Sequence, residues 1–276
     1  MIGAMHAKPS IEDPARLSTE LLLMAYRGGV FPMADSRDDD EIFWVEPRER
    51  AIIPLNGFRL SRSLAKVVRQ DRFRVTCNAA FAEVIRACAA PRTDHPDTWI
   101  NQRIEASYVA LHEAGHAHSI ECWLDGALVG GLYGVSFERV FCGESMFSCT
   151  DNASKVALAW LVALMRMAGY RLLDCQFLTD HLASMGAVTV TRLGYLELLA
   201  AARSDGVQAS LPGAWAQFSG ELVSAAGAGA SGSAAAGAAA VRAGALPEPP
   251  PPALDSRVTG DSSPGKLIAQ SFTHTS

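Results

Sequence analysis

The chain has 276 residues, of which 49% are apolar and 19% charged, and its formal net charge is -5. This composition is typical of a folded protein with a sizeable core and excludes a fibrous or wholly disordered chain. The negative sum argues against a generally basic nucleic-acid coat. It leaves a local phosphate-binding surface open, because attraction depends on where positive charges are concentrated.

Cysteine spacing and hydropathy indicate a compartment. The six cysteines form no C-x-x-C pair and no dense framework, which is typical of reduced, mostly buried thiols. The first 16 residues lack the apolar run of a signal peptide. The most apolar stretch, Val156–Ala168, contains Arg166 and is too short to cross a bilayer. We therefore expect a cytoplasmic protein without a membrane span.

The N-terminal part predicts a small lobe over residues 1–57. Leucine and alanine recur at helical spacing over 17–26, and Gly28-Gly29 ends that helix. Two short apolar runs, 42–45 and 51–54, predict extended segments. A short helix therefore opens the fold, and short extended pieces follow it.

Residues 58–212 predict a mixed α/β domain. Helices are expected at 60–69, 79–90 and 102–113, and strands at 73–77, 119–124, 127–135 and 140–148. Asp125-Gly126 predicts a two-residue hairpin turn between two of these strands. A buried helix over 154–167, capped by Asp151 or Asn152, then leads to a strand at 171–178. The resulting β-β-β-α-β order predicts an α/β (α+β) layer fold.

Residues 213–276 are rich in Ala, Gly and Pro, and predict a disordered low-complexity tail. The last segment, 266–276, regains apolar residues and could dock on the body. A frayed end is the commoner outcome for such a segment, so we expect one here.

One string has the H-E-x-x-H pattern of zinc proteases, His112-Glu113-Ala114-Gly115-His116. A zinc site needs both histidines on one face of a continuing helix. Gly115 stands where the helix over 102–113 should end, and an alternating, strand-like segment follows it. We therefore expect a helix C-terminus here and no metal site.

Glu144 lies in a predicted strand with Cys142 and Met146 on the same face, so a carboxylate stands on an apolar surface. It must find an ion-pair partner or a ligand there. Ser145 is part of an incomplete G-x-S-x-G elbow, because Phe147 replaces the second glycine, and we do not expect it to be a nucleophile.

Asp174 and Gln176 alternate with apolar residues in the last predicted strand, so they share one face. An acid beside an amide is suited to orienting an attacking amine and handling its proton. The same alternation also describes a polar face turned to solvent, and the two interpretations remain open.

Arg59, Arg62, Lys66 and Arg69 recur at spacings that place four positive charges on one side of a helix. Such a stripe binds nucleic-acid phosphates in some proteins and is an ordinary solvated face in others. The spacing alone does not decide between them.

Eight strings stand in the same order, with similar gaps, as in the bacterial leucyl/phenylalanyl-tRNA–protein transferases, over about residues 17–199. They are LMAYRG (23–28), FP (31–32), SRS (61–63), TWI (98–100), HAHSIE (116–121), FCGESMFS (141–148), NASK (152–155) and DCQ (174–176). The chain therefore resembles this family. It departs from the family pattern at Met33, where members often carry tryptophan.

The resemblance implies a small N-terminal lobe, a domain similar to the acetyltransferase (GNAT) fold, and neither metal nor cofactor. It implies transfer of leucine, also phenylalanine and less readily methionine, from aminoacyl-tRNA to the α-amine of proteins that begin with Arg or Lys. Such transfer creates an N-degron that marks the protein for degradation.

The resemblance also implies roles for individual residues. Glu144, Asp174 and Gln176 would be catalytic, with Asp174 orienting Gln176, while Gln176 or the ribose oxygen of the substrate takes the amine proton. The residues expected to bind the aminoacyl group and the tRNA end are Leu132, Phe141, Gly143, Met146, Leu161, Met165 and Trp99. Arg62, Lys66 and Arg69 would hold the tRNA backbone.

Three other functions are the alternatives. An acyl-CoA-dependent N-acyltransferase is disfavoured because Thr150-Asp151-Asn152 stands where a glycine-rich pyrophosphate loop would precede the long helix. A zinc protease needs the helix geometry rejected above. A non-catalytic protein that binds tRNA or protein ends predicts binding without turnover. The preference among leucine, phenylalanine and methionine is left open, because one methylene changes binding by only about 1–3 kcal/mol.

Overall fold

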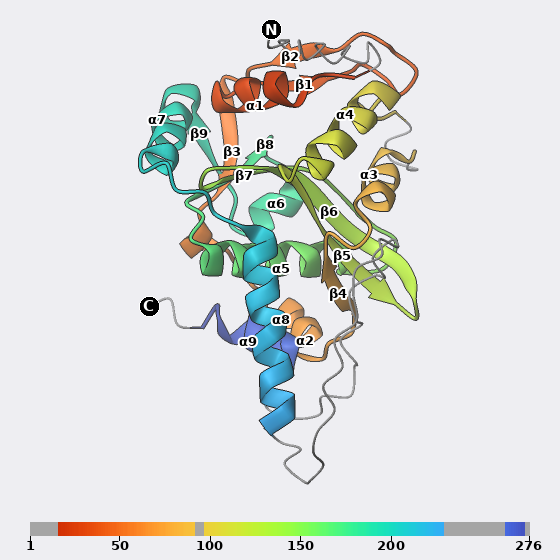
Figure 1. Cartoon of the computed structure of the whole chain (residues 1–276), viewed down its shortest axis with the longest axis vertical. Helices are drawn as coiled ribbons and strands as arrows, with labels where there is room; N and C mark the ends of the chain where they lie inside the picture. The colour runs from red at the N-terminus through yellow and green to blue at the C-terminus, as the bar shows by residue number, and fades with distance from the viewer. Residues whose placement is uncertain (1–15, 92–96, 229–262, 274–276) are drawn as a thin grey trace, which may run out of the picture. The chain divides into compact units, whose positions relative to one another are not determined.

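The structure is a computed structural model that describes residues 16–91, 97–228 and 263–273. The chain forms two compact units, each built from two segments. The first unit comprises Met1–Glu46 and Ala89–Ala117, and the second Pro47–Cys88 and His118–Ser276. Figure 1 labels the elements of both. Within the described residues, no helix combines the length and apolar character that a membrane span requires.

Among its described residues, the first unit contains two helices and a two-stranded sheet. The helices are α1 (Thr19–Arg27) and α4 (Gln102–Glu113), and the antiparallel strands are β1 (Phe31–Met33) and β2 (Phe43–Val45). The side chain of Ser18 caps α1, and the helix ends at Gly28 as predicted. The buried hydroxyl groups of Tyr26 and Tyr108 form a hydrogen bond between α1 and α4.

A seven-stranded mixed sheet forms the second unit, in the order β4-β5-β6-β7-β8-β3-β9. The strands are β3 (Glu49–Ile53), β4 (Arg74–Cys77), β5 (Ala117–Leu124), β6 (Ala127–Phe137), β7 (Val140–Ser148), β8 (Leu172–Gln176) and β9 (Val188–Thr191). Asp125 and Gly126 both have positive φ, as the predicted hairpin turn requires. The mixed α/β class and the β-β-β-α-β order of β5 to β8 are thus confirmed.

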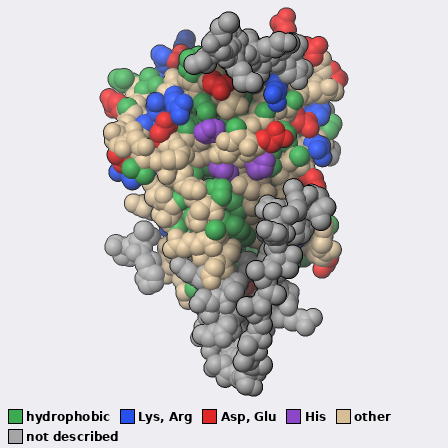
Figure 2. Space-filling model, in the orientation of Figure 1, with side chains coloured by type: hydrophobic (Ala, Val, Ile, Leu, Met, Phe, Trp, Pro, Cys, Tyr) green, Lys and Arg blue, Asp and Glu red, His purple; other side chains and the backbone are tan. Residues whose placement is uncertain are grey.

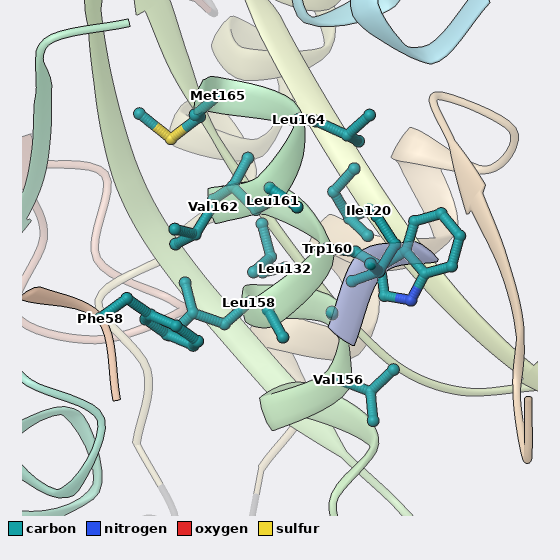
Figure 3. Packing of buried hydrophobic residues seen from close by; sticks show 14 of the residues in the cluster. Phe58, Ile120, Leu132, Val156, Leu158, Trp160, Leu161, Val162, Leu164 and Met165 are labelled. Atoms are coloured by element: carbon teal, nitrogen blue, oxygen red, sulfur yellow. The ribbon is translucent and has the colours of Figure 1, made fainter. Parts of the chain in front are cut away.

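The long helix α5 (Ala153–Ala168) forms the centre of the core (Figure 3). It packs on β6 and β7, and also contacts α2 (Arg62–Arg69) and α8 (Leu211–Ala228). Trp160 lies 5.8 Å from Trp215 and 5.3 Å from Phe218, ring centroid to ring centroid. Because α5 is covered by both the sheet and these helices, it is apolar on nearly all sides.

The ends of α5 agree only in part with the sequence. Gly169 ends the helix in a left-handed conformation, as expected. Asn152 is the N-cap residue, as predicted, but its side chain makes no capping hydrogen bond. The predicted position of the cap is therefore right, and the predicted side-chain hydrogen bond is wrong. The hydroxyl of Ser148 instead accepts the N–H of Ser154 at 3.3 Å.

In the part that the structure describes, the second unit contains four further helices besides α9 (Pro264–Gln270). They are α3 (Phe81–Ala89), α6 (Asp180–Ser184), α7 (Arg192–Arg203) and the short 3-10 helix η1 (Leu55–Gly57). Helix α7 contacts β3, β7, β8 and β9, and so lies over the part of the sheet that carries the site described below.

The two units divide the chain differently from the ranges 1–57 and 58–212 expected from the sequence. Strand β3 falls within the range of the expected lobe, yet it pairs between β8 and β9. Its run Ala51–Ile53 is buried throughout, as an interior strand of a covered sheet requires. Helix α4, in turn, belongs to the first unit.

Within its described residues, the predicted tail contains two helices. Helix α8 extends to residue 228, and Ala214 and Phe218, one turn apart near its start, pack into the core. Residues 229–262 lie outside the described residues. Helix α9 (Pro264–Gln270) packs on α2, so the expected frayed end is wrong for these residues. The N–H of Gly265 donates to the carboxylate of Asp71 at 2.6 Å.

The contact of α9 with α2 generates a prediction. A Cβ atom at Gly265 would lie 1.8 Å from the carbonyl oxygen of Val68, which is backbone and cannot rotate away. We expect Gly265→Val to displace α9 and to lower the free energy of unfolding by about 1–3 kcal/mol in a urea titration.

The matched control is Gly220→Ala on α8, where an added Cβ meets nothing within 4 Å. That change should leave the free energy of unfolding the same or raise it by up to about 1 kcal/mol. Equal unfolding curves for wild type and Gly265→Val would contradict the packing of α9 on α2.

Candidate active site

The parallel strands β7 and β8 separate at one end of their pairing. Their last paired residues are Cys142 and Asp174. Just beyond this point β7 has a bulge at Glu144, because Gly143 pairs with Gly134 and Ser145 with Tyr133. Strand β8 has a bulge at Cys175, because Asp174 pairs with Ile52 and Gln176 with Ala51. Bulges of this kind redirect side chains and are common beside active sites.

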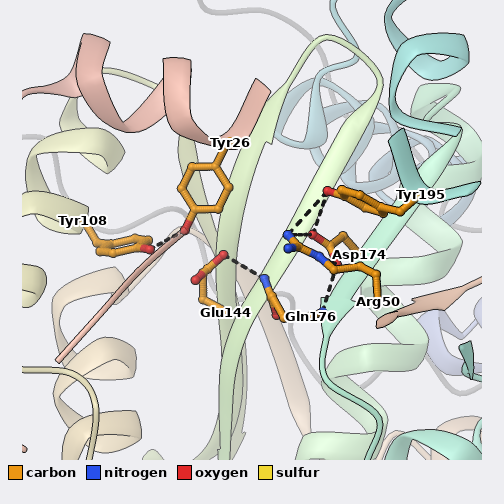
Figure 4. Close-up of polar contacts among 7 residues, drawn as sticks. All are labelled: Tyr26, Arg50, Tyr108, Glu144, Asp174, Gln176 and Tyr195. Carbon is orange, nitrogen blue, oxygen red and sulfur yellow. Dashed lines mark hydrogen bonds and ion pairs between the residues drawn. The ribbon is translucent and has the colours of Figure 1, made fainter. Parts of the chain in front are cut away.

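Glu144 and Gln176 meet across this opening (Figure 4). Each lies two residues beyond the last pair, and the carboxamide Nε2 of Gln176 donates to Oε1 of Glu144 at 3.0 Å. The bulge interrupts the strict alternation that would put Glu144 on the face of Cys142 and Met146, so that expectation is wrong. Glu144 is half-buried and 6% of Gln176 is exposed.

Asp174 lies two residues before Gln176 on β8 and is fully buried. Its Oδ1 accepts the Nε–H of Arg50 at 2.9 Å, and its Oδ2 accepts Nη2 of Arg50 at 2.6 Å and the hydroxyl of Tyr195 at 3.0 Å. Because both Asp174 and Gln176 are buried, a polar strand face turned to solvent is excluded.

The link between Asp174 and Gln176 runs through the main chain. Oδ1 of Asp174 accepts the backbone N–H of Gln176 at 2.9 Å, while the carboxamide of Gln176 is directed to Glu144. Asp174 therefore orients Gln176 by fixing its backbone, and not by bonding its side chain.

Gln176 has an unusual backbone conformation, with a φ of 55°. The N–H of Phe177 donates to the carbonyl of Cys175 at 2.6 Å, two residues back, around Gln176. A turn of this kind with positive φ is rare and strained, and for a residue other than glycine it needs external support.

Burial and nearby charge shift the pKa values of the groups around Asp174. Burial lowers the pKa of Arg50, but the adjacent Asp174 carboxylate more than offsets this and raises it above its ordinary value. Burial, and then the charge of Asp174, raise the pKa of Tyr195 and of the Cys142 thiol. Cys142 therefore stays protonated at neutral pH and is no thiolate nucleophile.

The apolar residues predicted to form the aminoacyl pocket lie in the core. Leu132, Phe141, Leu161 and Met165 are all at most 3% exposed and belong to one packed cluster, while Met146 is partly buried against it. Gly143 precedes Glu144 on β7. Trp99 is half-buried in the first unit, where its carbonyl accepts the N–H of Ala34 at 3.2 Å.

The predicted tRNA-binding residues lie on α2 in the second unit. Arg62, Lys66 and Arg69 are exposed, whereas Leu64, Ala65 and Val68 face the core. These three residues form the predicted one-sided stripe, whereas Arg59, its fourth expected member, lies before the N-cap Ser61 and outside the helix. On the face shown in Figure 2, Lys and Arg side chains alternate with Asp and Glu, so this view contains no extended basic field.

The H-E-x-x-H string lacks the helical geometry of a zinc site. Helix α4 ends at Glu113, and Gly115 has a φ of 81°, so His116 leaves the helical path as expected. Nδ1 of His112 is hydrogen-bonded to the carbonyl of Ala117 at 2.8 Å. Across the described ranges, no group of three or more His, Cys, Asp or Glu side chains is placed to hold a metal ion. None of the six cysteines, all of which lie in the described ranges, forms a disulfide.

Sequence reasoning missed Arg50 and Tyr195. Arg50 stands directly before the buried run Ala51–Ile53, and a charged residue at the start of an interior strand is a usable signal for a buried ion pair. Tyr195 lies on α7 with Leu199 and Ala202 at helical spacing, which indicates burial but no partner.

Two protein-family models match most of the described chain. The model for "Leucyl/phenylalanyl-tRNA protein transferase" matches residues 52–200, and the model for the N-terminal domain of the same family matches residues 15–48. This chain belongs to the leucyl/phenylalanyl-tRNA–protein transferase family. The matched range 52–200 includes Glu144, Asp174, Gln176 and Tyr195, and Arg50 falls between the two matches.

Of two relatives named leucyl/phenylalanyl-tRNA–protein transferase, one covers nearly the whole chain and the other about two thirds of it. The relative from Novosphingobium aromaticivorans is 58% identical over 96% of this chain and 98% of its own length. The one from Rhizorhabdus wittichii is 63% identical over 66% of this chain and 74% of its own. Likeness to solved structures is weak: L-PGS of Bacillus licheniformis has a TM-score of 0.33 at 12% identity, covering 61% of this chain and 56% of that one. The expected similarity to the acetyltransferase fold therefore stays a prediction.

Proposed function

We propose that this chain transfers leucine, and also phenylalanine and less readily methionine, from aminoacyl-tRNA to the N-terminal α-amine of proteins that begin with Arg or Lys. Membership in the family carries this proposal, supported by a relative that is 58% identical and matched over 98% of its length. The reaction takes place in the cytoplasm and gives its product a new N-terminal residue that marks it for degradation.

The reaction is the aminolysis of an ester. The α-amine nitrogen attacks the aminoacyl carbonyl carbon, a C–N bond forms, and the C–O bond to the ribose breaks. The amine proton finally resides on the ribose oxygen that leaves. Because the ester is already activated, the barrier that the protein must lower is largely one of positioning and proton transfer.

Gln176 and Glu144 are suited to that task. With Nε2 of Gln176 donating to Glu144, the carboxamide oxygen of Gln176 is the group that accepts an N–H of the attacking amine. A carboxamide does not hold a proton at neutral pH. Glu144 is half-buried. Its carboxylate either relays the amine proton or stabilises the positive charge on the nitrogen. The ribose oxygen then takes up the proton.

Asp174 has a different role in this scheme. Both of its oxygen atoms accept hydrogen bonds from protein groups, and its side chain is fully buried, so it supports Gln176 and does not accept the proton of the amine. The aminoacyl side chain enters beside Met146, against the apolar cluster of Leu132, Phe141, Leu161 and Met165, with Gly143 at its edge.

The tRNA is held by α2 and by Trp99. Arg62, Lys66 and Arg69 bind its phosphates, and the Trp99 ring stacks near its acceptor end. No cofactor or metal takes part. An acyl-CoA-dependent N-acyltransferase is the second candidate, and the donor used by the protein separates the two.

One assay tests the proposal. Labelled leucyl-tRNA or acetyl-CoA is supplied with peptides that begin with Arg, Lys or Ala, and incorporation at the N-terminus is measured. We expect transfer from leucyl-tRNA to the first two peptides, and none from acetyl-CoA. Binding of tRNA without transfer to any peptide would contradict the proposed function.

The assigned roles predict the effect of changing Gln176. Gln176→Ala should lower kcat for leucine transfer by about 100-fold or more, because the group that orients the amine is lost. The control Gln217→Ala removes an exposed glutamine on α8 and should keep the wild-type kcat. A wild-type rate for Gln176→Ala would show that its carboxamide does not act in the reaction.

The assignment of α2 predicts a salt-dependent binding defect. The triple change Arg62→Ala, Lys66→Ala and Arg69→Ala should raise KM for leucyl-tRNA and leave kcat near the wild-type value. The slope of log affinity against log salt concentration should fall by roughly 0.7–0.9 for each phosphate contact removed.

Arg86→Ala, which removes an exposed arginine from α3, is the control for the loss of positive charge. If the slope of log affinity for tRNA against log salt concentration is the same in Arg86→Ala and in the triple variant, α2 contributes only to the overall charge of the protein and is not a tRNA-binding surface.

A further inference from the structure

We propose that Arg50 and Tyr195 are positioning residues for Gln176: together with Asp174 they hold its main chain in the left-handed turn, and thereby hold its carboxamide against Glu144. The inference rests on the proposed function because it concerns the same site. It assigns a role in the reaction to two side chains that do not reach the opening between β7 and β8.

The turn at Gln176 needs such a support. Its φ of 55° is disfavoured for a residue with a Cβ atom, and the hydrogen bond from Phe177 to Cys175 closes a strained three-residue turn. A conformation of this kind persists only where surrounding groups fix it. Relaxation of the turn would rotate the carboxamide away from Glu144.

Asp174 provides the direct hold, and Arg50 and Tyr195 hold Asp174. The oxygen that accepts the backbone N–H of Gln176 also accepts Nε of Arg50, each at 2.9 Å. The other oxygen accepts Nη2 of Arg50 and the hydroxyl of Tyr195. The carboxylate plane is therefore fixed from β3, from α7 and from the turn itself.

Arg50 and Tyr195 also fix each other. The guanidinium carbon of Arg50 lies 4.5 Å from the centroid of the Tyr195 ring, a cation–π arrangement (Figure 4). The two side chains are 1% and 2% exposed, so neither touches a substrate. Any effect they have on the reaction must pass through Asp174 and the turn.

This chain of contacts predicts a defect in turnover and not in tRNA binding. A small displacement of a group that orients the reacting atoms lowers the rate strongly. The exposed basic face of α2 does not depend on the network. Variants of Arg50 and Tyr195 should therefore lower kcat and leave KM for leucyl-tRNA nearly unchanged.

The decisive experiment is a double-mutant cycle with Tyr195→Phe, which removes one hydroxyl and keeps the ring over Arg50. Leucine transfer is measured under single-turnover conditions for wild type, Tyr195→Phe, Gln176→Ala and the double variant. We expect about a tenfold loss from Tyr195→Phe in the wild-type background, the size typical of one hydrogen bond to a charged group. In the Gln176→Ala background the same change should cost about twofold or less, because the group through which Tyr195 acts is gone.

Equal losses in the two backgrounds would overturn the inference, since a merely structural role lowers activity independently of Gln176. The control Tyr170→Phe removes the hydroxyl of another buried tyrosine, which is hydrogen-bonded to Ser136. This change should lower the rate of leucine transfer by the same factor in both backgrounds, or leave the rate unchanged in both. Transfer by the wild type in the same assay tests the proposed function separately, so the two failures are distinguishable.

A second measurement applies if Gln176→Ala leaves too little activity to compare. The backbone N–H of Gln176 should exchange with solvent deuterium faster in Tyr195→Phe and in Arg50→Lys than in wild type, because the carboxylate that accepts it is less firmly held. Its exchange in Tyr170→Phe should match wild type. Unchanged exchange in Tyr195→Phe and Arg50→Lys would also overturn the inference.

Discussion

The buried ion pair between Arg50 and Asp174 is the constraint on which the site depends. Transferring two charges out of water costs several kcal/mol for each ion, and only close, multiple hydrogen bonds offset that cost. Here the guanidinium binds both oxygens of the carboxylate, and Tyr195 and the N–H of Gln176 occupy the remaining positions. The pair requires β3 to lie beside β8, and α7 to cover them, so it ties three separate segments of the chain to one carboxylate.

The pairing of β7 with β8 ends next to this ion pair. Strands β7 and β8 are parallel because α5 crosses between them, and their pairing stops at Cys142 and Asp174. A bulge on each strand follows at once, and Glu144 and Gln176 then meet over the gap. The site therefore combines a fully buried ion pair with a Glu144–Gln176 contact in which Glu144 is half-buried. This division matches a reaction that needs a fixed hydrogen-bond acceptor more than a strong base.

Much of the fold could be predicted from the sequence because local signals agree with the tertiary structure. The helix expected at 102–113 has those bounds in α4, and Gly115 and Gly169 end their helices in the left-handed conformation. The order of β5, β6, β7, α5 and β8 follows from turn residues and from the change of hydrophobic period. Family resemblance further singled out Glu144, Asp174 and Gln176.

The remaining features depend on long-range contacts that no local pattern contains. Arg50 and Asp174 are 124 positions apart, and nothing around Asp174 indicates that its partner lies in the segment assigned to the N-terminal lobe. The bulge at Glu144 arises from pairing with β6, so strict alternation gave the wrong face. Helix α9 is short and weakly patterned, and its contact with α2 supplies the stability that its own sequence lacks.

The most direct test of this account replaces the ion pair without leaving a charge unpaired. Paired replacement of a buried ion pair by apolar residues of similar size is often neutral for stability, so Arg50→Met combined with Asp174→Leu can give a folded protein. Cooperative unfolding establishes that it is folded, and leucine transfer from tRNA is then measured. The account predicts that the folded double variant transfers leucine about 100-fold more slowly than wild type. A folded double variant with the wild-type rate would contradict it, because Gln176 would then be held in place without the pair.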